Sequence, residues 1–279
     1  FDRVIEDSKK TLNQKFLHES LYSKSLLELL LGKFDEGWEL YENRFFIDQH
    51  KEFENFKKEK IYNKIDKKNI PYIKNVNDFQ NSNLLIISEQ GIGEHLIFLP
   101  LISEVSKLSK STTVLIDSRL IPLCERSFKN IIFLPLGDNN ISNDLLNKKI
   151  SILKKSNFDY QISSASLPNF LRKHLNDFNK TPNHFLKVNE QLKNKIKDQI
   201  KIKKDKKIVG ISWTSFNSAL KYFKNIDLKQ LGLLFKDLNI SLRNNSLIAN
   251  NAKLIDKELN VYLIKSIYYI LFITIFIIM

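Results

Sequence analysis

Apolar residues recur at helical spacing through residues 16–48 and predict two helices. The first set is Phe16, Leu17, Leu21, Leu26, Leu27, Leu30 and Leu31, and the second is Phe34, Trp38, Tyr41 and Phe45. Gly32 lies between the two sets. A glycine between two amphipathic helices favours a tight turn, so the sequence predicts a helical hairpin.

The pattern changes at Asn83, where Leu84-Leu85-Ile86-Ile87 is a short, continuous apolar run typical of a buried parallel strand. Further strands are predicted at 113–116, 131–134 and 160–162, with helical patterns between them. This alternation predicts an α/β domain with a parallel sheet. After it we expect a helix at 169–175 that begins at Pro168, a charged helix at 190–204, a strand at 208–213 and a helix at 227–238.

These patterns divide the chain into four parts: a hairpin at 1–48, a connector at 49–80, an α/β domain at 81–190, and the start of a second α/β domain at 191–279. Residues 239–260 have weak periodicity, and 266–279 are almost wholly apolar. A bilayer-spanning helix needs about 20 apolar residues, which this tail does not reach. Three alternatives for this tail stay open. They are an altered reading frame, a weak membrane anchor, and a buried strand or helix. We expect one or two strands in this last part.

Charge and composition exclude several classes of protein. The net charge is +13, but the lysines are spread along the chain and no nucleic-acid-binding motif accompanies them. We therefore expect attraction to anionic substrates or lipid head groups rather than to nucleic acid. The one cysteine, Cys124, forms no intramolecular disulfide, and the five histidines lack the spacing of metal ligands. These features favour the cytoplasm and predict no metal or other cofactor.

The first strand is followed by Glu89-Gln90-Gly91-Ile92-Gly93-Glu94-His95, a glycine-containing loop that opens a helix. Glycines let a ligand approach the backbone, and a helix N-terminus offers free N–H groups to anions. Leu96 occupies the place of the third glycine of a dinucleotide-binding loop, so the residues alone indicate a general α/β ligand loop.

Two family resemblances sharpen this interpretation. The string from Leu31 to Tyr41 resembles a tetratricopeptide repeat, with Gly32 at the turn and Gly37 where the helices cross. A lone repeat cannot bury its apolar face, so we expect further repeats before Phe1, and hence that the chain is a fragment. A plain helical hairpin is the alternative.

The loop after the first strand resembles that of the heptosyltransferase-like family 9 glycosyltransferases, and more closely that of repeat-containing bacterial glycosyltransferases. Gly93-Glu94 and Pro100 match the first family, and Glu89 to Glu94 match the second. The resemblance implies that Glu94 is the general base and that Glu89, Gln90, Gly91 and Gly93 contact the acceptor. Glu94 replaces the family's Asp, which moves the carboxylate by one methylene. The alternative role of Glu94 is to complement the helix dipole.

A second match begins at Gly210-Ile211-Ser212-Trp213 and continues to Ile226-Asp227-Leu228. The resemblance implies that a basic residue after this strand meets the donor phosphates, with Lys224 favoured over Lys221. Ser212 and Thr214 are candidates to hydrogen-bond a phosphate or ribose. Solvated loop lysines and ordinary strand-end hydroxyls are the alternatives.

The resemblance as a whole implies two Rossmann-like domains in the GT-B arrangement, which transfer a sugar from a nucleotide sugar to a glycan, lipid-linked or protein acceptor. No metal is needed if lysines and helix dipoles offset the diphosphate charge. We expect cytoplasmic location, peripheral to the inner membrane, with at most weak membrane association. The donor site looks incomplete, since no later glycine loop follows 239. The alternative is a non-catalytic module that binds a protein partner through its repeat-like helices and retains a relic α/β domain.

Overall fold

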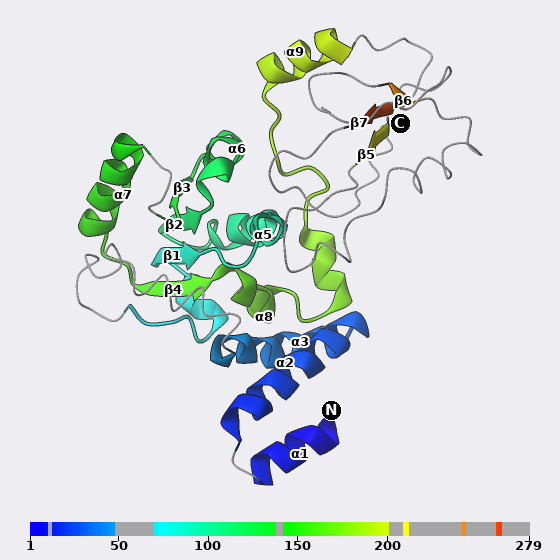
Figure 1. The fold of residues 1–279 in the computed structure, drawn as a ribbon. Coiled ribbons are helices and arrows are strands. Elements are labelled where there is room, and N and C mark those ends of the chain that lie inside the picture. The colour runs from blue at the N-terminus through cyan, green and yellow to red at the C-terminus, as the bar shows by residue number, and fades with distance from the viewer. Residues whose placement is uncertain are drawn as a thin grey trace. The chain divides into compact units, whose positions relative to one another are not determined.

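The computed structural model describes residues 1–10, 13–47, 70–137 and 142–200, together with three short strands at 209–211, 242–243 and 261–263. The chain divides into two compact units, Phe1–Lys187 and Val188–Met279. Figure 1 shows both units, and each is described by itself below.

Three helices open the first unit: α1 (Asp2–Lys10), α2 (Gln14–Leu30) and α3 (Phe34–Tyr41). The predicted turn lies at Gly32, whose φ of 77° is in the left-handed region that glycine adopts without strain. On α3, a Cβ added to Gly37 would lie 2.8 Å from the Leu29 side chain of α2. The two helices therefore cross where the sequence has no side chain. The likeness of this hairpin to a tetratricopeptide repeat stays a prediction.

The four strands predicted in the α/β domain are confirmed as β1 (Asn83–Ile87), β2 (Ser111–Ile116), β3 (Ile131–Pro135) and β4 (Tyr160–Ser163). All pairings between them are parallel, and their order in the sheet is β3-β2-β1-β4. In register, Ile87 of β1 lies beside Leu115 of β2 and Ser163 of β4. Apart from Ile132 on β3, which is exposed, the apolar runs are buried, as expected for a parallel sheet with helices on its faces.

Helices connect the strands on both faces of this sheet: α5 (Ile92–Val105), α6 (Ile121–Ser127) and α7 (Asn143–Lys155). Right-handed crossovers place a helix on one face when the chain moves outward to β2 and β3, and on the other when it returns to β4. Figure 1 shows α5 and α7 on opposite sides of the sheet accordingly. On the α7 face, Leu153 packs with Leu85, Ile87, Leu115 and Leu134.

Short 3-10 turns complete the unit: η1 (Glu42–Phe46), η4 (Val76–Phe79), η5 (Ser118–Leu120), η6 (Ser164–Ser166) and η7 (Leu175–Lys180). The helix predicted at 169–175 is the shorter α8 (Pro168–Leu171). The end of the connector pairs with β4 through backbone hydrogen bonds. The Gln161 backbone N–H donates to the Pro71 carbonyl (2.9 Å), and the Ile73 backbone N–H donates to the Gln161 carbonyl (3.2 Å). Cys124 is fully buried, and burial raises the pKa of its thiol to about 12.

The second unit begins with α9 (Glu190–Ile200) and contains β5 (Val209–Ile211), β6 (Leu242–Arg243) and β7 (Val261–Leu263). These strands pair in parallel in the order β5-β7-β6. The expectation of one or two strands was therefore wrong. Runs of two or three residues are too short to show a period, which is why β6 and β7 were not predicted. The helix predicted at 227–238 and the apolar tail 266–279 lie outside the described residues.

Candidate functional site

The strand order places a topological switch point between β1 and β4. From β1 the chain moves outward to β2 and β3, and then returns to add β4 on the other side of β1. In open α/β sheets, ligands bind beside the carboxyl ends of the strands at such a point, because the connections diverge there. The segments at this point are the Glu89–Glu94 loop after β1 and η6 after β4.

The loop after β1 makes a sharp bend before α5 begins. Gln90 has a φ of 65°, a left-handed conformation that is uncommon for residues other than glycine. Gly91 is the N-cap of α5 and makes no side-chain cap. The first intrahelical bond at this end runs from the His95 N–H to the Gly91 carbonyl (3.1 Å). The bend therefore sets where the helix starts and which way its first turn faces.

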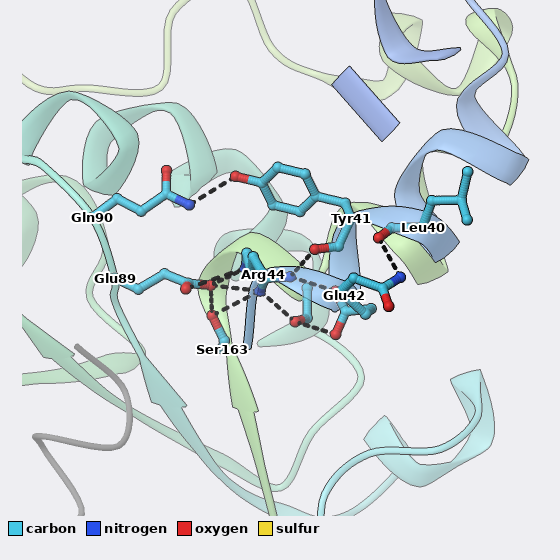
Figure 2. Close-up of polar contacts among 9 residues, drawn as sticks. Leu40, Tyr41, Glu42, Arg44, Glu89, Gln90 and Ser163 are labelled. Carbon is cyan, nitrogen blue, oxygen red and sulfur yellow. Dashed lines mark hydrogen bonds and ion pairs between the residues drawn. The ribbon is translucent and has the colours of Figure 1, made fainter. Parts of the chain in front are cut away.

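The side chain of an arginine from the hairpin lies at the switch point, between the segments that follow β1 and β4. Arg44, in η1, is fully buried, and its guanidinium faces the Glu89 carboxylate, which is 3% exposed. The Nη2–Oε1 distance is 2.6 Å, and Nε donates to both carboxylate oxygens at 3.1 and 3.2 Å. Figure 2 shows the two side chains meeting end to end. A planar fork against a carboxylate is the strongest ion-pair geometry available to these groups.

Further hydrogen bonds occupy the remaining N–H groups of Arg44. Nη1 donates to Glu42 (2.8 Å) and to the Tyr41 carbonyl (3.2 Å), and Nη2 donates to the Ser166 hydroxyl (2.8 Å). Ser166 donates in turn to Glu42 (2.9 Å), and the Ser163 hydroxyl donates to Glu89. Burial lowers the pKa of the Arg44 guanidinium, but Glu89 and Glu42 raise it above its ordinary value, so the group stays charged.

A second bond from the hairpin reaches the loop itself. Gln90 Nε2 donates to the Tyr41 hydroxyl at 2.7 Å, as Figure 2 shows. The Tyr41 ring packs with Phe98 of α5 and Ala165 of η6, and the Arg44 guanidinium lies 4.7 Å from the ring centroid. Burial raises the pKa of the Tyr41 phenol, so the hydroxyl is neutral at physiological pH. The hairpin thus holds two successive residues of the loop, Glu89 and Gln90.

Polar atoms on the α5 side of the same edge are buried without such partners. His95 is 3% exposed; its Nδ1 accepts from the Asp117 N–H (3.4 Å), and its Nε2 has no hydrogen-bond partner among the described residues. The hydroxyls of Ser88 and Ser164, which directly follow β1 and β4, are also unpartnered within the described parts of the chain. Burial lowers the pKa of His95, so the ring is neutral near pH 7.

Glu94 lies in the first turn of α5, four residues after Gln90. It is half-buried, and no hydrogen bond or ion pair joins its carboxylate to another residue in the described ranges. Its Oε2 lies over the loop, 2.8 Å from where a Cβ on Gly91 would stand. Gly91 therefore leaves the space that this carboxylate occupies. An unpaired carboxylate beside a helix N-terminus can accept a proton from a bound hydroxyl.

The predicted site residues of the first unit thus share one loop but differ in environment. The Glu89 carboxylate is held in its ion pair with Arg44, and the Gln90 side chain donates to Tyr41. Gly91 is the N-cap of α5, and Gly93 lies in its first turn. The predicted donor residues are Ser212, Thr214, Lys221 and Lys224, which lie outside the described residues. Among the described residues, no three His, Cys, Asp or Glu side chains are grouped to hold a metal ion.

Sequence reasoning missed Arg44, Ser163, Ser166 and His95. Arg44 carries the one signal that was available, a charged residue within an aromatic stretch, Tyr41 to Phe46. A charge at that place needs a buried partner, and Glu89, two residues after an apolar strand, raises the same question. The two serines and His95 carry no comparable signal, because isolated polar residues of these types are common at strand ends and helix starts.

The chain is similar to Protein FlbA of Caulobacter vibrioides, with 28% identity over 116 residues. The match spans 39% of this chain and 17% of FlbA, so the matched segment covers about a sixth of that relative's length. No family model matches the chain, and no solved structure matches it significantly. No described helix is both long enough and apolar enough to cross a bilayer.

Proposed function

We propose that this chain is part of a GT-B-type glycosyltransferase that carries tetratricopeptide-like repeats and transfers a sugar from a nucleotide sugar to a hydroxyl acceptor. The first sheet is the acceptor half, and the second unit is the start of the donor half. The observation that carries the proposal is the position of Glu94, an unpaired carboxylate at the carboxyl end of β1 beside the switch point. The sequence resemblance of the loop supports the same assignment.

In the proposed reaction Glu94 removes the proton from the acceptor hydroxyl. The acceptor oxygen bonds to the anomeric carbon of the donor sugar as the bond from that carbon to the diphosphate oxygen breaks. The nucleoside diphosphate leaves with the electron pair. Lys224, or Lys221, offsets its charge, and Ser212 and Thr214 hydrogen-bond its phosphate or ribose. This scheme needs no metal ion and no cofactor.

Burial separates the roles of the two loop carboxylates. Glu89 is paired with Arg44 and is 3% exposed, whereas Glu94 is only half-buried and has no described partner. We therefore assign proton abstraction to Glu94 and assign Glu89 to holding the loop. Gly91 and Gly93 let the acceptor approach the backbone, as the resemblance implies.

The test uses a protein that joins this chain to a complete donor half. Glu94→Gln should leave acceptor binding within about twofold and lower turnover by at least about 100-fold, the usual contribution of a general base. Glu125→Gln on α6, a surface carboxylate paired with Lys148, is the matched control and should keep full turnover. Turnover like that of the wild type in Glu94→Gln would exclude the general-base role.

For the isolated chain we expect no tight binding of nucleotide sugars. Residues 239–279 hold no glycine loop able to cradle a diphosphate. Calorimetry with uridine, guanosine and adenosine diphosphate sugars measures this directly. Micromolar binding of any of them would mean that the donor site is complete, and would overturn the interpretation of the tail.

A second candidate function is a non-catalytic module that binds a protein partner. The observation that favours it is an apolar set on α2 and the turn after it that stays exposed: Phe16, Leu26, Leu27, Leu30 and Leu31. Leu30 is 81% exposed, which is unusual for an apolar side chain beside a helix crossing. A partner helix with an apolar face fits this set. Leu30→Glu should abolish such binding without changing sugar transfer.

A further inference from the structure

We infer that Tyr41 and Arg44 of the helical hairpin are positioning residues for the Glu89–Glu94 loop, so that the hairpin is an integral part of the site and not a separate binding module. The inference rests on the proposed function for what the loop does. It rests on geometry alone for how the loop is held, and the two can fail separately.

The first step is that the loop is anchored by the hairpin, which lies outside the α/β part of the same compact unit. Arg44 and Glu89 are 45 residues apart in sequence, and both side chains are buried. The Glu89 carboxylate receives three guanidinium contacts and the Ser163 hydroxyl. A carboxylate so held has little freedom to rotate, and this fixes the backbone at the first residue of the loop.

The second step is that the next residue is strained. A φ of 65° is unfavourable for a glutamine relative to a right-handed conformation, and such strain persists only where the surroundings impose it. The surroundings here include the Tyr41 hydroxyl, which accepts from the Gln90 side chain. With Glu89 held on one side and the start of α5 on the other, this bond favours the bent form.

The third step connects the bend to Glu94. Gly91 follows Gln90 as the N-cap, and α5 begins at Ile92, so rotation at Gln90 reorients the first turn that carries Glu94. The Glu94 carboxylate lies over Gly91, so a movement of the Gly91 backbone would change the surroundings of this carboxylate. A displacement of about 1 Å at a catalytic group can cost 100-fold in rate. The hairpin thereby controls the carboxylate without touching it.

The closing experiment measures amide hydrogen exchange in the full chain for residues 88–95, with β3 as an internal reference. Tyr41→Phe keeps the ring that packs with Phe98 and removes the hydroxyl. Exchange in 88–95 should accelerate about fivefold, the effect of one lost hydrogen bond, while β3 stays unchanged. Tyr160→Phe, at the opposite end of the sheet, is the matched control and should leave 88–95 unchanged. If Tyr41 only stabilised the fold as a whole, exchange in 88–95 and in β3 would accelerate together, and the ratio of the two rates would not change.

A double-mutant cycle identifies the route. Glycine at 90 adopts positive φ without strain and carries no amide, so Tyr41→Phe should add nothing in the Gln90→Gly background. An undiminished effect there would overturn the inference, because the hydroxyl would then act elsewhere, for instance through Tyr22. Equal exchange in Tyr41→Phe and the wild type would also overturn it.

Arg44→Lys tests the second anchor. Lysine keeps the charge and loses the fork, so exchange in 88–95 should still accelerate. Unchanged exchange would mean that a charge at this position is sufficient, and would overturn the role of the guanidinium fork. None of these measurements involves sugar, so they stand if the transferase proposal fails. In the protein with a complete donor half, a loosened loop with undiminished turnover would overturn the positioning role in the reaction while leaving the geometry intact.

Discussion

Two regions at the same edge of the sheet differ in whether their polar groups have hydrogen-bond partners. On the hairpin side, Arg44, Glu89 and Ser166 satisfy one another in the interior. On the α5 side, His95 Nε2 and the Ser88 hydroxyl are buried without described partners, and Glu94 has none although it is only half-buried. Polar groups that are already paired can add stability but cannot bind substrate. Groups left unpaired cost stability and remain available to a ligand.

The difference separates structural from chemical roles within one loop. Glu89 and Glu94 are the same residue type five positions apart, and family resemblance treats both as site residues. Their surroundings divide them, since Glu89 is paired with a buried guanidinium and Glu94 lies by a helix N-terminus with its carboxylate unpaired. If this division is right, changes on the hairpin side should affect stability most, and changes on the α5 side least.

The largest effect is expected for Arg44→Met. The variant leaves the Glu89 carboxylate buried and unpaired, which should lower the free energy of unfolding by about 3–5 kcal/mol. Urea unfolding at pH 7 measures it.

The control for that variant is Arg44→Met combined with Glu89→Met. Removing both charges leaves no buried charge without its partner, and the double variant should recover most of the lost stability. A double variant as unstable as Arg44→Met would show that packing around the side chain matters more than its charge. The hairpin side would then lose its special place in the comparison.

The next effect comes from two serines in the same 3-10 turn. Ser166→Ala removes a hydroxyl that bonds both Arg44 and Glu42, and should lower the free energy of unfolding by about 1–2 kcal/mol. Ser164→Ala removes a buried hydroxyl without a described partner, and should be neutral or stabilising by up to about 1 kcal/mol. Thermal unfolding of the pair makes the comparison directly. The reverse order of stabilities would break it.

A smaller effect concerns the pH dependence of stability at His95. Burial lowers its pKa below the ordinary value of about 6.5, so the unfolded chain takes up a proton before the folded chain does. Stability from this group is present above pH 6.5 and is lost as the pH falls below it. His95→Asn should flatten that slope, whereas His184→Asn, at an exposed position, should not. An unchanged slope in His95→Asn would mean that the ring is solvated.

The sequence predicts those features that a pattern of neighbouring residues records. Three of the four parallel strands contain a continuous apolar run, as at Leu84–Ile87, and β4 was predicted from the alternation of strand and helix patterns. Gly32 and Gly37 marked the turn and the crossing of the hairpin. Helix α1 was missed because its nine residues are mostly polar. The Arg44–Glu89 pair could not be predicted, since it joins positions 45 residues apart and no local pattern records which charges meet in the interior.

The smallest effect is expected for Glu94→Gln, and it sharpens the comparison most. Since the Glu94 carboxylate has no described hydrogen bond or ion pair, the substitution should change the free energy of unfolding by less than about 0.5 kcal/mol. Glu89→Gln, by contrast, replaces a charge opposite a buried guanidinium and should be clearly destabilising. Urea unfolding of both variants at pH 7 tests this. Equal losses would mean that Glu94 also serves the fold. If Glu94→Gln is stable, a loss of turnover in the protein with a complete donor half would report on the proposed proton transfer, because the fold would be unchanged.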